Sequence, residues 1–399
     1  MKILYSAIDQ TVPGTKGGSV HVAAVAEGLA ALGHEVTALI TPGDGVPRPS
    51  GVRWVALPPP FGSPRLRMVR AGAIARIARG IRPDAIVERY HNFGGEAIRS
   101  AGALNAVAVL EVNAPVIDHP GSSKALLDRA LLAEPMRRWR EHLCAIADVI
   151  VTPNAAILPA GIPAERIRVL EWGADTERFR PGVEGPAPYA RPGVATVAIF
   201  AGAFRSAHGA IHLVEAIKIL RARGEKDVGA VLIGDGSELP RVRQAAGGID
   251  TIVLTGALPH DRMPAALAGA DIGVAPFDIG AHAPLSLGFY WSPLKIFEYM
   301  AAGLPLAAPA VDRIPSLVAD RREGLLYDPR GSRAPGSGGP AEALADTLVT
   351  LKDPGLRARL GAAARERAVR DYSWTAHCRA LEAAIVNARD ARARGKKRG

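Results

Sequence analysis

Cysteine is scarce in this chain of 399 residues, with Cys144 and Cys378 as the two examples. They are far apart and lie in segments with a helical pattern, so the sequence does not favour a disulfide framework. Both are predicted to be small core residues, as free cysteines usually are. Aromatic residues are also few, at 5%, while Ala and Gly are abundant, which favours closely packed helices and tight turns.

Long hydrophobic runs are missing as well. No stretch approaches the 18 or so apolar residues of a membrane-spanning helix, so none is expected. The apolar start, Met1 to Ile8, is too short for a signal peptide, and we expect a cytoplasmic protein. At 48% hydrophobic residues, the chain is long enough for two domains with separate cores.

Acidic residues are outnumbered by basic ones, which gives a formal net charge of +10. Half of this charge lies after Ala388, where a frayed basic terminus is one interpretation. A second basic stretch alternates with apolar residues and contains no acid, so it is either an amphipathic helix at a membrane surface or the solvated face of a core helix. Peripheral contact with the cytoplasmic membrane face is therefore one expectation, whereas no nucleic-acid motif accompanies the charge. The second stretch consists of Arg65, Arg67, Arg70, Arg76, Arg79 and Arg82.

Short apolar strands and amphipathic helices alternate along the whole chain. This order predicts mostly parallel, doubly wound sheets of the α/β class. Residues 181–193 are rich in Pro and Gly and are interpreted as a linker. We therefore predict a first Rossmann-like domain at 1–183, a second at 194–368 and a C-terminal helix with a basic tail at 369–399. Two such domains in tandem predict a cleft where the carboxyl ends of their strands face each other.

The stretch from Tyr290 to Pro305 carries the strongest local signals. Ser292 is a favourable N-cap, Pro293 suits the first turn, and Gly303 with the following proline indicates a stop. These residues predict a helix of about three turns. A buried strand is expected directly after it.

Lys295 and Glu298 are placed by this helix on neighbouring positions of one face. A cation beside a free helix N-terminus suits phosphate, because the orphan N–H groups and the helix dipole add to its charge. A carboxylate one turn deeper can accept two sugar hydroxyls. Together they predict a site for a nucleotide diphosphate and its ribose. The alternative is an exposed i,i+3 ion pair.

Three glycine-containing loops add candidates. Arg205 and His208 follow the first strand of the second domain and open a helix, where a pyrophosphate fits, although a surface Arg in a capping loop explains them equally. Gly234-Asp235-Gly236 follows the next strand and is otherwise a plain turn. In the first domain, Gly17 and Gly18 allow a close approach of backbone to a ligand or form a turn only.

The order of these motifs resembles the family 4 retaining glycosyltransferases of the GT-B fold over nearly the whole chain. The matching features are Gly17-Gly18 with His21, Gly33-His34-Glu35-Val36, Glu111-Val112-Asn113-Ala114-Pro115, Gly173-Ala174-Asp175 with Phe179 and Pro181, Phe204-Arg205 with His208-Gly209, Gly234-Asp235-Gly236, Ser292-Pro293-Leu294-Lys295, Glu298-Tyr299, Gly303-Leu304-Pro305 and Tyr372-Ser373-Trp374.

The resemblance implies a nucleotide-sugar donor held mainly by the second domain. Arg205 and Lys295 would neutralise the diphosphate leaving group, Glu298 would bind the ribose hydroxyls, and Asn113 would lie near the donor sugar. A C-terminal helix would cross back to the first domain. The implied donor-binding residues are Gly17, Gly18, His208, Gly234, Gly236, Tyr290, Pro293 and Leu294.

Two positions depart from the family pattern. Tyr290 stands where a first glutamate is common, which leaves the donor sugar open, and His208 replaces the usual Lys. No Asp-x-Asp cluster occurs in a suggestive place, so we expect neither a metal nor a cofactor. Fixed cations and helix N-termini suffice to stabilise the departing diphosphate.

The sequence thus predicts a metal-independent hexosyltransferase that uses a nucleotide sugar, with UDP-sugars favoured over GDP-mannose. The acceptor is expected to be a glycan, a lipid-linked sugar or a small molecule. A sugar-nucleotide epimerase and a non-catalytic scaffold on the same fold are the alternatives. A nicotinamide dehydrogenase is disfavoured, because neither glycine loop has the G-x-G-x-x-G pattern.

Overall fold

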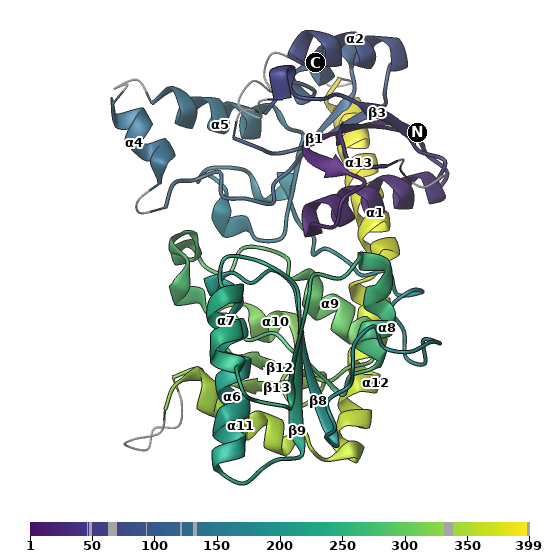
Figure 1. Ribbon diagram of the computed structural model, residues 1–399. Helices are drawn as coiled ribbons and strands as arrows, with labels where there is room; N and C mark the ends of the chain where they lie inside the picture. Colours follow the sequence, from purple (N-terminus) through teal and green to yellow (C-terminus); the bar gives the residue numbers. More distant parts are fainter. Residues whose placement is uncertain are drawn as a thin grey trace. The chain divides into compact units, whose positions relative to one another are not determined.

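The computed structural model describes residues 1–45, 47, 50–62, 70–92, 94–119, 122–130, 134–330 and 338–396. The chain forms two compact α/β units (Figure 1). The first contains Met1–Trp172, Tyr290–Ser292 and the C-terminal segment from Trp374, and the second contains Gly173–Phe289 and Pro293–Ser373. Over the residues just named, each unit has one sheet and it is parallel, as the alternating pattern predicts.

The sheet of the first unit has the strand order β3-β2-β1-β4-β5-β6-β7. All its strand pairs are parallel. Its strands are β1 (Lys2–Val12), β2 (Glu35–Pro42), β3 (Arg53–Ala56), β4 (Ala85–Arg89), β5 (Val107–Glu111), β6 (Val149–Thr152) and β7 (Ile167–Val169). The central strands β4 and β5 are buried at every position, because helices cover both faces of a parallel sheet.

The helices of the first unit lie between its strands along the chain, except for the last one. They are α1 (Gly17–Ala31), α2 (Ala71–Ile81), α3 (Ala101–Leu104), α4 (Ser123–Ala130), α5 (Pro135–Ile146) and α13 (Trp374–Lys396). The sequence indicates a loop over residues 11–19 before α1, and the observed loop is shorter. β1 runs on to Val12, and α1 already begins at Gly17, so Gly17 and Gly18 lie in the first helical turn.

The sheet of the second unit has the order β10-β9-β8-β11-β12-β13, and its strand pairs are parallel too. Its strands are β8 (Thr196–Ala201), β9 (Val228–Ile233), β10 (Ile252–Gly256), β11 (Ile272–Val274), β12 (Leu306–Pro309) and β13 (Gly324–Tyr327). Its helices are α6 (Ala210–Ala222), α7 (Leu239–Ala246), α8 (Met263–Ala268), α9 (Leu294–Ala301), α10 (Ile314–Leu317), α11 (Pro340–Thr350) and α12 (Pro354–Asp371).

The predicted linker is instead part of the second unit, which begins at Gly173 rather than after residue 183. Its side chains dock on that unit. The hydroxyl of Tyr189 donates to the carbonyl of Ala266 at 2.8 Å, and Arg191 forms an ion pair with Asp271 at 2.7 Å. Pro and Gly exclude regular structure, but they do not prevent a segment from packing.

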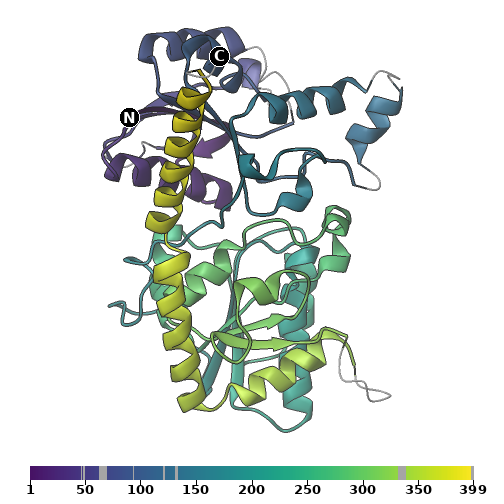
Figure 2. The same ribbon diagram turned by 180° about the vertical axis from the view of Figure 1, so that it is seen from behind.

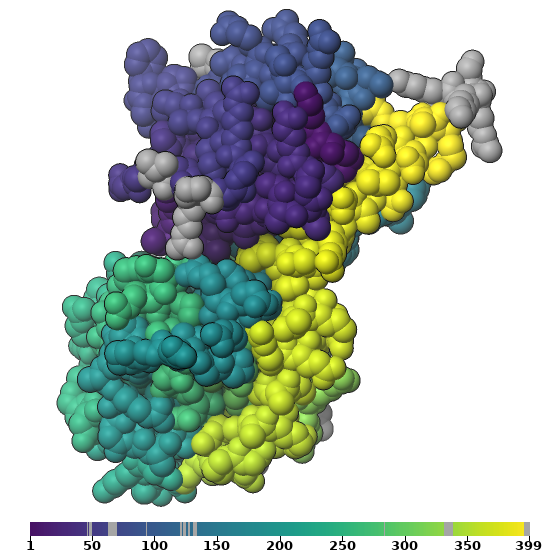
Figure 3. Space-filling model, turned by 90° about the vertical axis from the view of Figure 1, so that its right-hand side faces the viewer, coloured from purple at the N-terminus to yellow at the C-terminus, as the bar shows by residue number. Residues whose placement is uncertain are grey.

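The C-terminal helix α13 belongs to the first unit, as expected from the resemblance. It packs along α1 and against β5 and β6, and Figure 2 shows it lying across that unit. In the space-filling view its surface lies directly against the N-terminal part of the chain (Figure 3). Cys378 on α13 and Cys144 on α5 are both free and buried, in agreement with the predicted core role.

The interpretation of the basic tail as frayed is wrong as far as residue 396, because α13 continues to Lys396. Arg392 donates to the carbonyl of Ala106 and forms an ion pair with Asp148 at 3.1 Å. Lys397 and Arg398 lie outside the described residues.

The second basic stretch divides into different environments. Arg70 is buried and donates to the carbonyl oxygens of Leu57 and Ile8, so it is not on a surface. Arg76, Arg79 and Arg82 are exposed on or beside α2. Arg65 and Arg67 lie outside the described residues. No helix in the described part of the chain has the length and apolar character to cross a membrane.

Candidate functional site

The strand order of the second unit reverses between β8 and β11, and open α/β sheets bind ligands at the carboxyl ends of the strands at such a point. Three segments meet there. The loop 202–205 follows β8, Phe277 lies just after β11, and α9 leads into β12. The side chain of Lys295, in the first turn of α9, extends to this end of the sheet.

Lys295 is a buried cation. Its residue is 9% exposed, and its Nζ has no hydrogen-bond partner in the described part of the structure. Nζ lies 3.9 Å from the centre of the Phe200 ring and 5.3 Å from that of Phe277, which indicates cation–π contacts. A Cβ on Gly202 would lie 3.1 Å from Nζ. The ammonium therefore lies directly beneath the backbone where β8 ends.

Burial lowers the pKa of Lys295 to about 7, against the opposing effect of the Glu298 charge. An unpaired ammonium in such a place costs stability, since removal from water disfavours the charged form. Structural lysines normally avoid this cost with a carboxylate or a carbonyl. An anionic ligand would supply the missing partner.

His208 ends the short 3₁₀ turn Ser206–His208 that follows Arg205. Burial, and then the charge of Lys295, lower the pKa of His208 to about 3. His208 is therefore neutral at neutral pH, and any bond that it makes to a ligand is a neutral one. Arg205 is exposed at the start of this turn, and its charge also acts on His208. A Cβ on Gly202 would lie 3.1 Å from Nζ of Lys295 and 3.9 Å from Nδ1 of His208, so these two side chains meet at the end of β8, and Arg205 begins the same turn.

Glu298 lies one turn deeper on α9 and is 8% exposed. Its Oε1 contacts Nε2 of His260 at 3.0 Å rather than Lys295. The exposed i,i+3 ion pair is therefore not what the structure contains. His260, whose ring is tilted against that of Phe179 at a centroid distance of 5.6 Å, was not among the predicted residues.

Gly234 and Gly236 bring the loop after β9 against the loop after β8. A Cβ on Gly234 would lie 1.9 Å from the carbonyl oxygen of Gly202, and one on Gly236 would lie 2.5 Å from that of Phe204. Both glycines have positive φ, at +139° and +150°. Close backbone approach accounts for both residues without a ligand. Their role in donor binding stays a prediction.

The helix α9 is shorter than predicted, because it begins at Leu294 after the cap position Pro293. Ser292 does not cap it. The hydroxyl of Ser292 instead donates to Oε2 of Glu171 at 2.7 Å and accepts from the backbone N–H of Trp172 at 2.8 Å. These partners belong to the first unit, and so do Ser292 and the buried Tyr290.

A buried carboxylate organises the corresponding edge of the first sheet. Glu111 ends β5 and is 4% exposed. Its oxygens contact Nε2 of His21 at 2.6 Å, accept from the hydroxyl of Tyr5 at 2.7 Å and accept from Arg89 at 3.1 Å. The side-chain amide of Asn113 donates to the same carboxylate. The predicted Asn113 is therefore held in place within the first unit.

Opposing electrostatic effects act on the pKa values of two groups in this cluster, Glu111 and His21. Burial alone would raise the pKa of Glu111, but the contact with His21, the charge of Arg89 and the Tyr5 hydroxyl together lower it. Burial lowers the pKa of His21, against the opposing charge of Glu111 and the hydrogen bond to it. The signal for this cluster in the sequence is a charged residue at the end of an otherwise apolar strand.

Aromatic rings surround His21. Trp172 stacks on it at a centroid distance of 4.4 Å and donates its indole N–H to the side-chain oxygen of Asn113 at 2.9 Å. From α13, Trp374 and His377 approach the same ring edge-on at 5.4 and 5.6 Å. The predicted loop residue Gly18 lies nearby in sequence, where a Cβ would collide with the side chain of Gln10.

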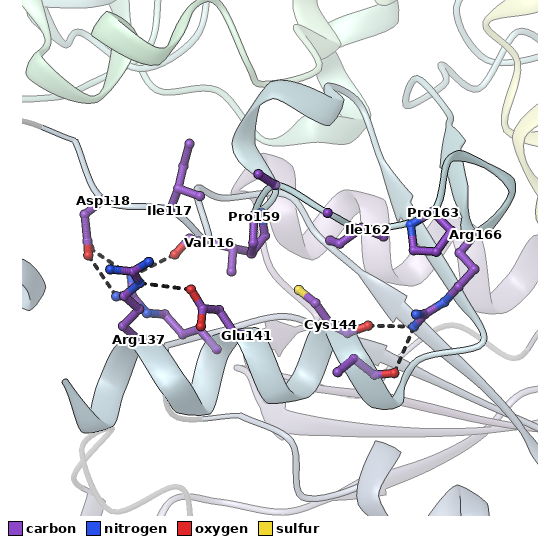
Figure 4. Close-up of a pocket in the computed structure, with 14 residues that line it drawn as sticks. Val116, Ile117, Asp118, Arg137, Glu141, Cys144, Pro159, Ile162, Pro163 and Arg166 are labelled. Carbon is purple, nitrogen blue, oxygen red and sulfur yellow. Dashed lines mark hydrogen bonds and ion pairs between the residues drawn. The ribbon is translucent and has the colours of Figure 1, made fainter. Parts of the chain in front are cut away.

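A cavity of about 610 Å³ opens in the first unit between α5 and the loops 116–118 and 159–166 (Figure 4). Val116, Ile117, Pro159 and Ile162 give it apolar walls. Arg140 beneath it is 1% exposed and pairs with Asp118. A pocket with apolar walls and a charged rim suits a small amphipathic molecule.

Among the described residues, the group able to offer three metal ligands lies in the first unit, at Glu88, His91 and Glu96.

The predicted site residues are divided between the two units. The second unit contains Arg205, His208, Lys295, Glu298, Gly234, Gly236, Pro293 and Leu294, and the first contains Asn113, Gly17, Gly18 and Tyr290.

Comparison with known proteins gives consistent matches in both units. Residues 195–351 match the family described as Glycosyl transferases group 1, and residues 15–178 match Glycosyltransferase Family 4. A GDP-mannose-dependent alpha-mannosyltransferase of Mycolicibacterium smegmatis is 28% identical over 346 residues, 80% of this chain and 83% of that protein. A phosphatidyl-myo-inositol mannosyltransferase of Mycobacterium leprae is 27% identical over 381 residues, 91% of this chain and 90% of that protein.

Among solved structures, Anabaena Alr3699/HepE in complex with UDP-glucose aligns with a TM-score of 0.69 at 17% identity, covering 97% of this chain and 100% of that one. A glycosyltransferase from Rickettsia africae aligns with a TM-score of 0.68 at 18% identity, covering 97% and 98%. At this level of identity the likeness shows the fold, which is the two-domain GT-B architecture.

Proposed function

The chain belongs to the group 1, family 4 glycosyltransferases, and from this premise we propose that it transfers a hexosyl group, with retention of configuration, from a nucleotide diphosphate sugar to an acceptor hydroxyl. The observation that carries the proposal is the buried Nζ of Lys295, which has no partner in the described structure and lies beneath the end of β8.

The diphosphate of the donor is the partner that we assign to Lys295. Arg205 adds a second, exposed cation next to the same turn, and neutral His208 can donate one hydrogen bond. As the bond to the sugar breaks, negative charge develops on the diphosphate. Cations that are already fixed in place stabilise that charge without reorganisation.

Glu298 is proposed to accept hydrogen bonds from the ribose hydroxyls. A carboxylate with two oxygens matches two neighbouring hydroxyls, and His260 holds one of its oxygens at 3.0 Å. This contact fixes the orientation of the carboxylate, so His260 is a positioning residue for the ribose.

Retention without a metal follows from the same charges. The departing diphosphate can take the proton of the acceptor hydroxyl on the face that it leaves, so attack occurs on that face. Lys295 and Arg205 hold the diphosphate in position during this step. We propose that no divalent ion is required for transfer.

GDP-mannose is the donor that we expect first. The sequence favoured a UDP-sugar, and the Anabaena structure contains UDP-glucose. However, the Mycolicibacterium relative, which matches over most of both chains, is named for GDP-mannose. Relatives over shorter stretches transfer other sugars, such as N-acetyl-D-glucosamine to 2-deoxystreptamine in Streptomyces fradiae.

The acceptor is assigned to the first unit, whose 610 Å³ cavity offers apolar walls and a charged rim. A lipid-linked acceptor at a membrane is one candidate, with Arg76, Arg79 and Arg82 as the exposed contacts on α2. Exchange of these three for Gln should weaken sedimentation with anionic vesicles. Unchanged sedimentation would exclude this surface.

The proposal is tested by incubating the protein with GDP-, UDP-, ADP- and dTDP-sugars in the presence of EDTA and following donor cleavage by mass spectrometry. We expect cleavage of one donor, lost in Lys295→Ala and in Glu298→Ala. Lys218→Ala is the matched control, because Lys218 is an exposed lysine on α6 paired with Glu215. It should behave as the wild type.

Two alternatives predict other results. A scaffold on the same fold would cleave no donor and would not be stabilised by any nucleoside diphosphate. An epimerase would change the sugar while leaving its bond to the nucleotide intact. Dependence of cleavage on added Mg²⁺ would contradict the metal-free mechanism while leaving the transfer itself in place.

A further inference from the structure

A second cluster of ionisable side chains lies in the first unit, at the carboxyl end of β4. It consists of Glu88 in the strand and of His91 and Glu96 in the loop that follows. One ligand atom from each side chain lies within 4.8 Å of the other two. Nε2 of His91 is 3.7 Å from Oε2 of Glu96. Glu88 and Glu96 are 1% and 5% exposed.

Glu88 has evident structural partners. Its carboxylate accepts backbone N–H groups from Gly95 at 2.6 Å, Ala97 at 3.1 Å and Ile98 at 2.6 Å. These bonds fold the loop over the strand end. Burial raises the pKa of Glu88, and the three backbone hydrogen bonds oppose that shift. A carboxylate has about four lone-pair directions, so one remains for another ligand.

Glu96 has no comparable set of partners. Neither of its carboxylate oxygens makes a hydrogen bond of normal geometry in the described part of the structure, although both are inaccessible to water, and the groups beside them are the carboxylate of Glu88 and the imidazole of His91. The negative charge of Glu88 acts on it unfavourably, and Arg70 is the basic group that acts in the opposite direction. A buried carboxylate that faces another one needs a compensating cation or proton.

We propose that Glu88, His91 and Glu96 bind a divalent cation, with Zn²⁺ as the ion best suited to the site. Two carboxylates and one imidazole form a mixed oxygen and nitrogen ligand set that zinc accepts, with a water in the fourth position. The ion offsets the negative charge of the two carboxylates and coordinates the oxygens of Glu96.

The loop is shaped to hold this arrangement. Gly95 has a φ of +107°, and a Cβ there would lie 2.4 Å from Cδ2 of Leu143 on α5, so the loop is pressed against the helix. Trp139 on α5 donates its indole N–H to the carbonyl of Gly94 at 3.0 Å. In tetrahedral zinc sites ligand atoms are about 3.3 Å apart, so the cluster has to tighten by an ångström or so at its widest.

The role of this ion is structural, and it does not depend on the proposed transfer reaction. Glu88 precedes Arg89, whose guanidinium holds Glu111 and Asp9. An ion at Glu88 would stabilise the position of the end of β4, where Arg89 lies. A structural ion of this kind is compatible with transfer chemistry that uses no metal.

The test uses the full-length protein, stripped of metal with EDTA and returned to EDTA-free buffer. Isothermal titration with ZnCl₂ should show one ion per chain with micromolar or tighter affinity, and saturating zinc should raise the melting temperature. Glu96→Gln, which has nearly the same shape, should weaken zinc binding at least about tenfold. His142→Asn, at an exposed histidine on α5, should bind as the wild type.

His91→Asn is a second variant in case Glu96→Gln does not fold, and it should also lose zinc affinity. Equal zinc affinity in the wild type and in the folded ligand variants would overturn the proposal, because the ion would then bind elsewhere. It would be overturned equally if the wild type bound no zinc while Glu96→Gln melted at a higher temperature, since the carboxylate pair would then share a proton.

Discussion

Burial of the Lys295 side chain disfavours its protonated, charged form. Its pKa is about 7 in the folded protein against an ordinary value of 10.5, so between these values the unfolded chain binds more protons than the folded one. The contribution of this residue to stability therefore rises with pH through that window. Below pH 7 the folded protein bears the full cost of the buried ammonium.

We predict that Lys295→Met is more stable than the wild type at pH 6, by an amount on the order of a few kcal/mol, and that the difference shrinks as the pH rises toward 10. Urea unfolding at several pH values measures it. The same variant should bind the nucleoside diphosphate at least about 100-fold more weakly at pH 6. Lower stability at pH 6 would show that the charge is paired in the free protein.

Nucleotide affinity of the wild type should fall as the pH rises above about 7, because Lys295 loses its proton in the free protein. Lys295→Met should lack this part of the pH profile. Calorimetric titration with the preferred nucleoside diphosphate gives both curves. A wild-type profile that is flat between pH 6 and 9 would exclude Lys295 as the phosphate ligand.

Glu111 predicts the opposite pH dependence in the first unit. Its folded pKa lies below the ordinary value of 4.5, so its stabilising effect is present above that value and is lost as the pH falls below it. Glu111→Gln should lower stability at pH 7 by about 3 kcal/mol, because it leaves buried Arg89 poorly paired. Glu111→Gln should also reduce the loss of stability on going to acid pH. Glu35→Gln, at an exposed glutamate, should change neither the stability at pH 7 nor its dependence on pH.

At the scale of elements, the loops after β8 and β9 fit together through glycines. Gly234→Ala puts a methyl group 1.9 Å from the carbonyl oxygen of Gly202, at a φ of +139°. We predict a loss of at least about 3 kcal/mol in the free energy of unfolding. Gly224→Ala is the control. It also has positive φ, +85°, but open space around it, so only about 1 kcal/mol of backbone strain is expected.

The contact between α1 and α13 predicts a rescue. A Cβ on Gly28 would lie 2.5 Å from Sγ of Cys378, so Gly28→Ala should destabilise the protein by about 2 kcal/mol despite the better helix propensity of Ala. Cys378→Ala removes the sulfur and leaves a Cβ at 3.4 Å. The double variant should therefore be more stable than Gly28→Ala alone. Additive losses in denaturant unfolding would contradict this packing.

For the whole molecule, the sequence predicted the fold well because its signals are local and repeated. The apolar run that begins at Ala85 becomes β4, and the run Val149–Thr152 becomes β6, since apolar runs bounded by turn residues specify the strands of a parallel sheet. The site was predicted less completely. Lys295 and Glu298 are close on one helix, but His260 and the partners of Glu111 come from distant segments, and no local pattern encodes such contacts.

The linker shows why the boundaries were harder to predict. Residues 181–193 have the composition of a connection, yet Tyr189 and Arg191 attach them to the second unit. Ser292 likewise is a residue type that favours a helix cap, but its hydroxyl forms hydrogen bonds with Glu171 and Trp172 instead. In both cases tertiary contacts override a local preference that the sequence states correctly.

The return of α13 to the first unit has a consequence for synthesis on the ribosome. The β-strands of that unit emerge before the second unit, but the helix that covers α1, β5 and β6 emerges after it. Domains generally fold as they emerge, yet this one keeps the face that α13 covers open until α13 has been translated. The first unit can therefore finish folding only after the second unit has been synthesised, rather than when its own sheet is complete.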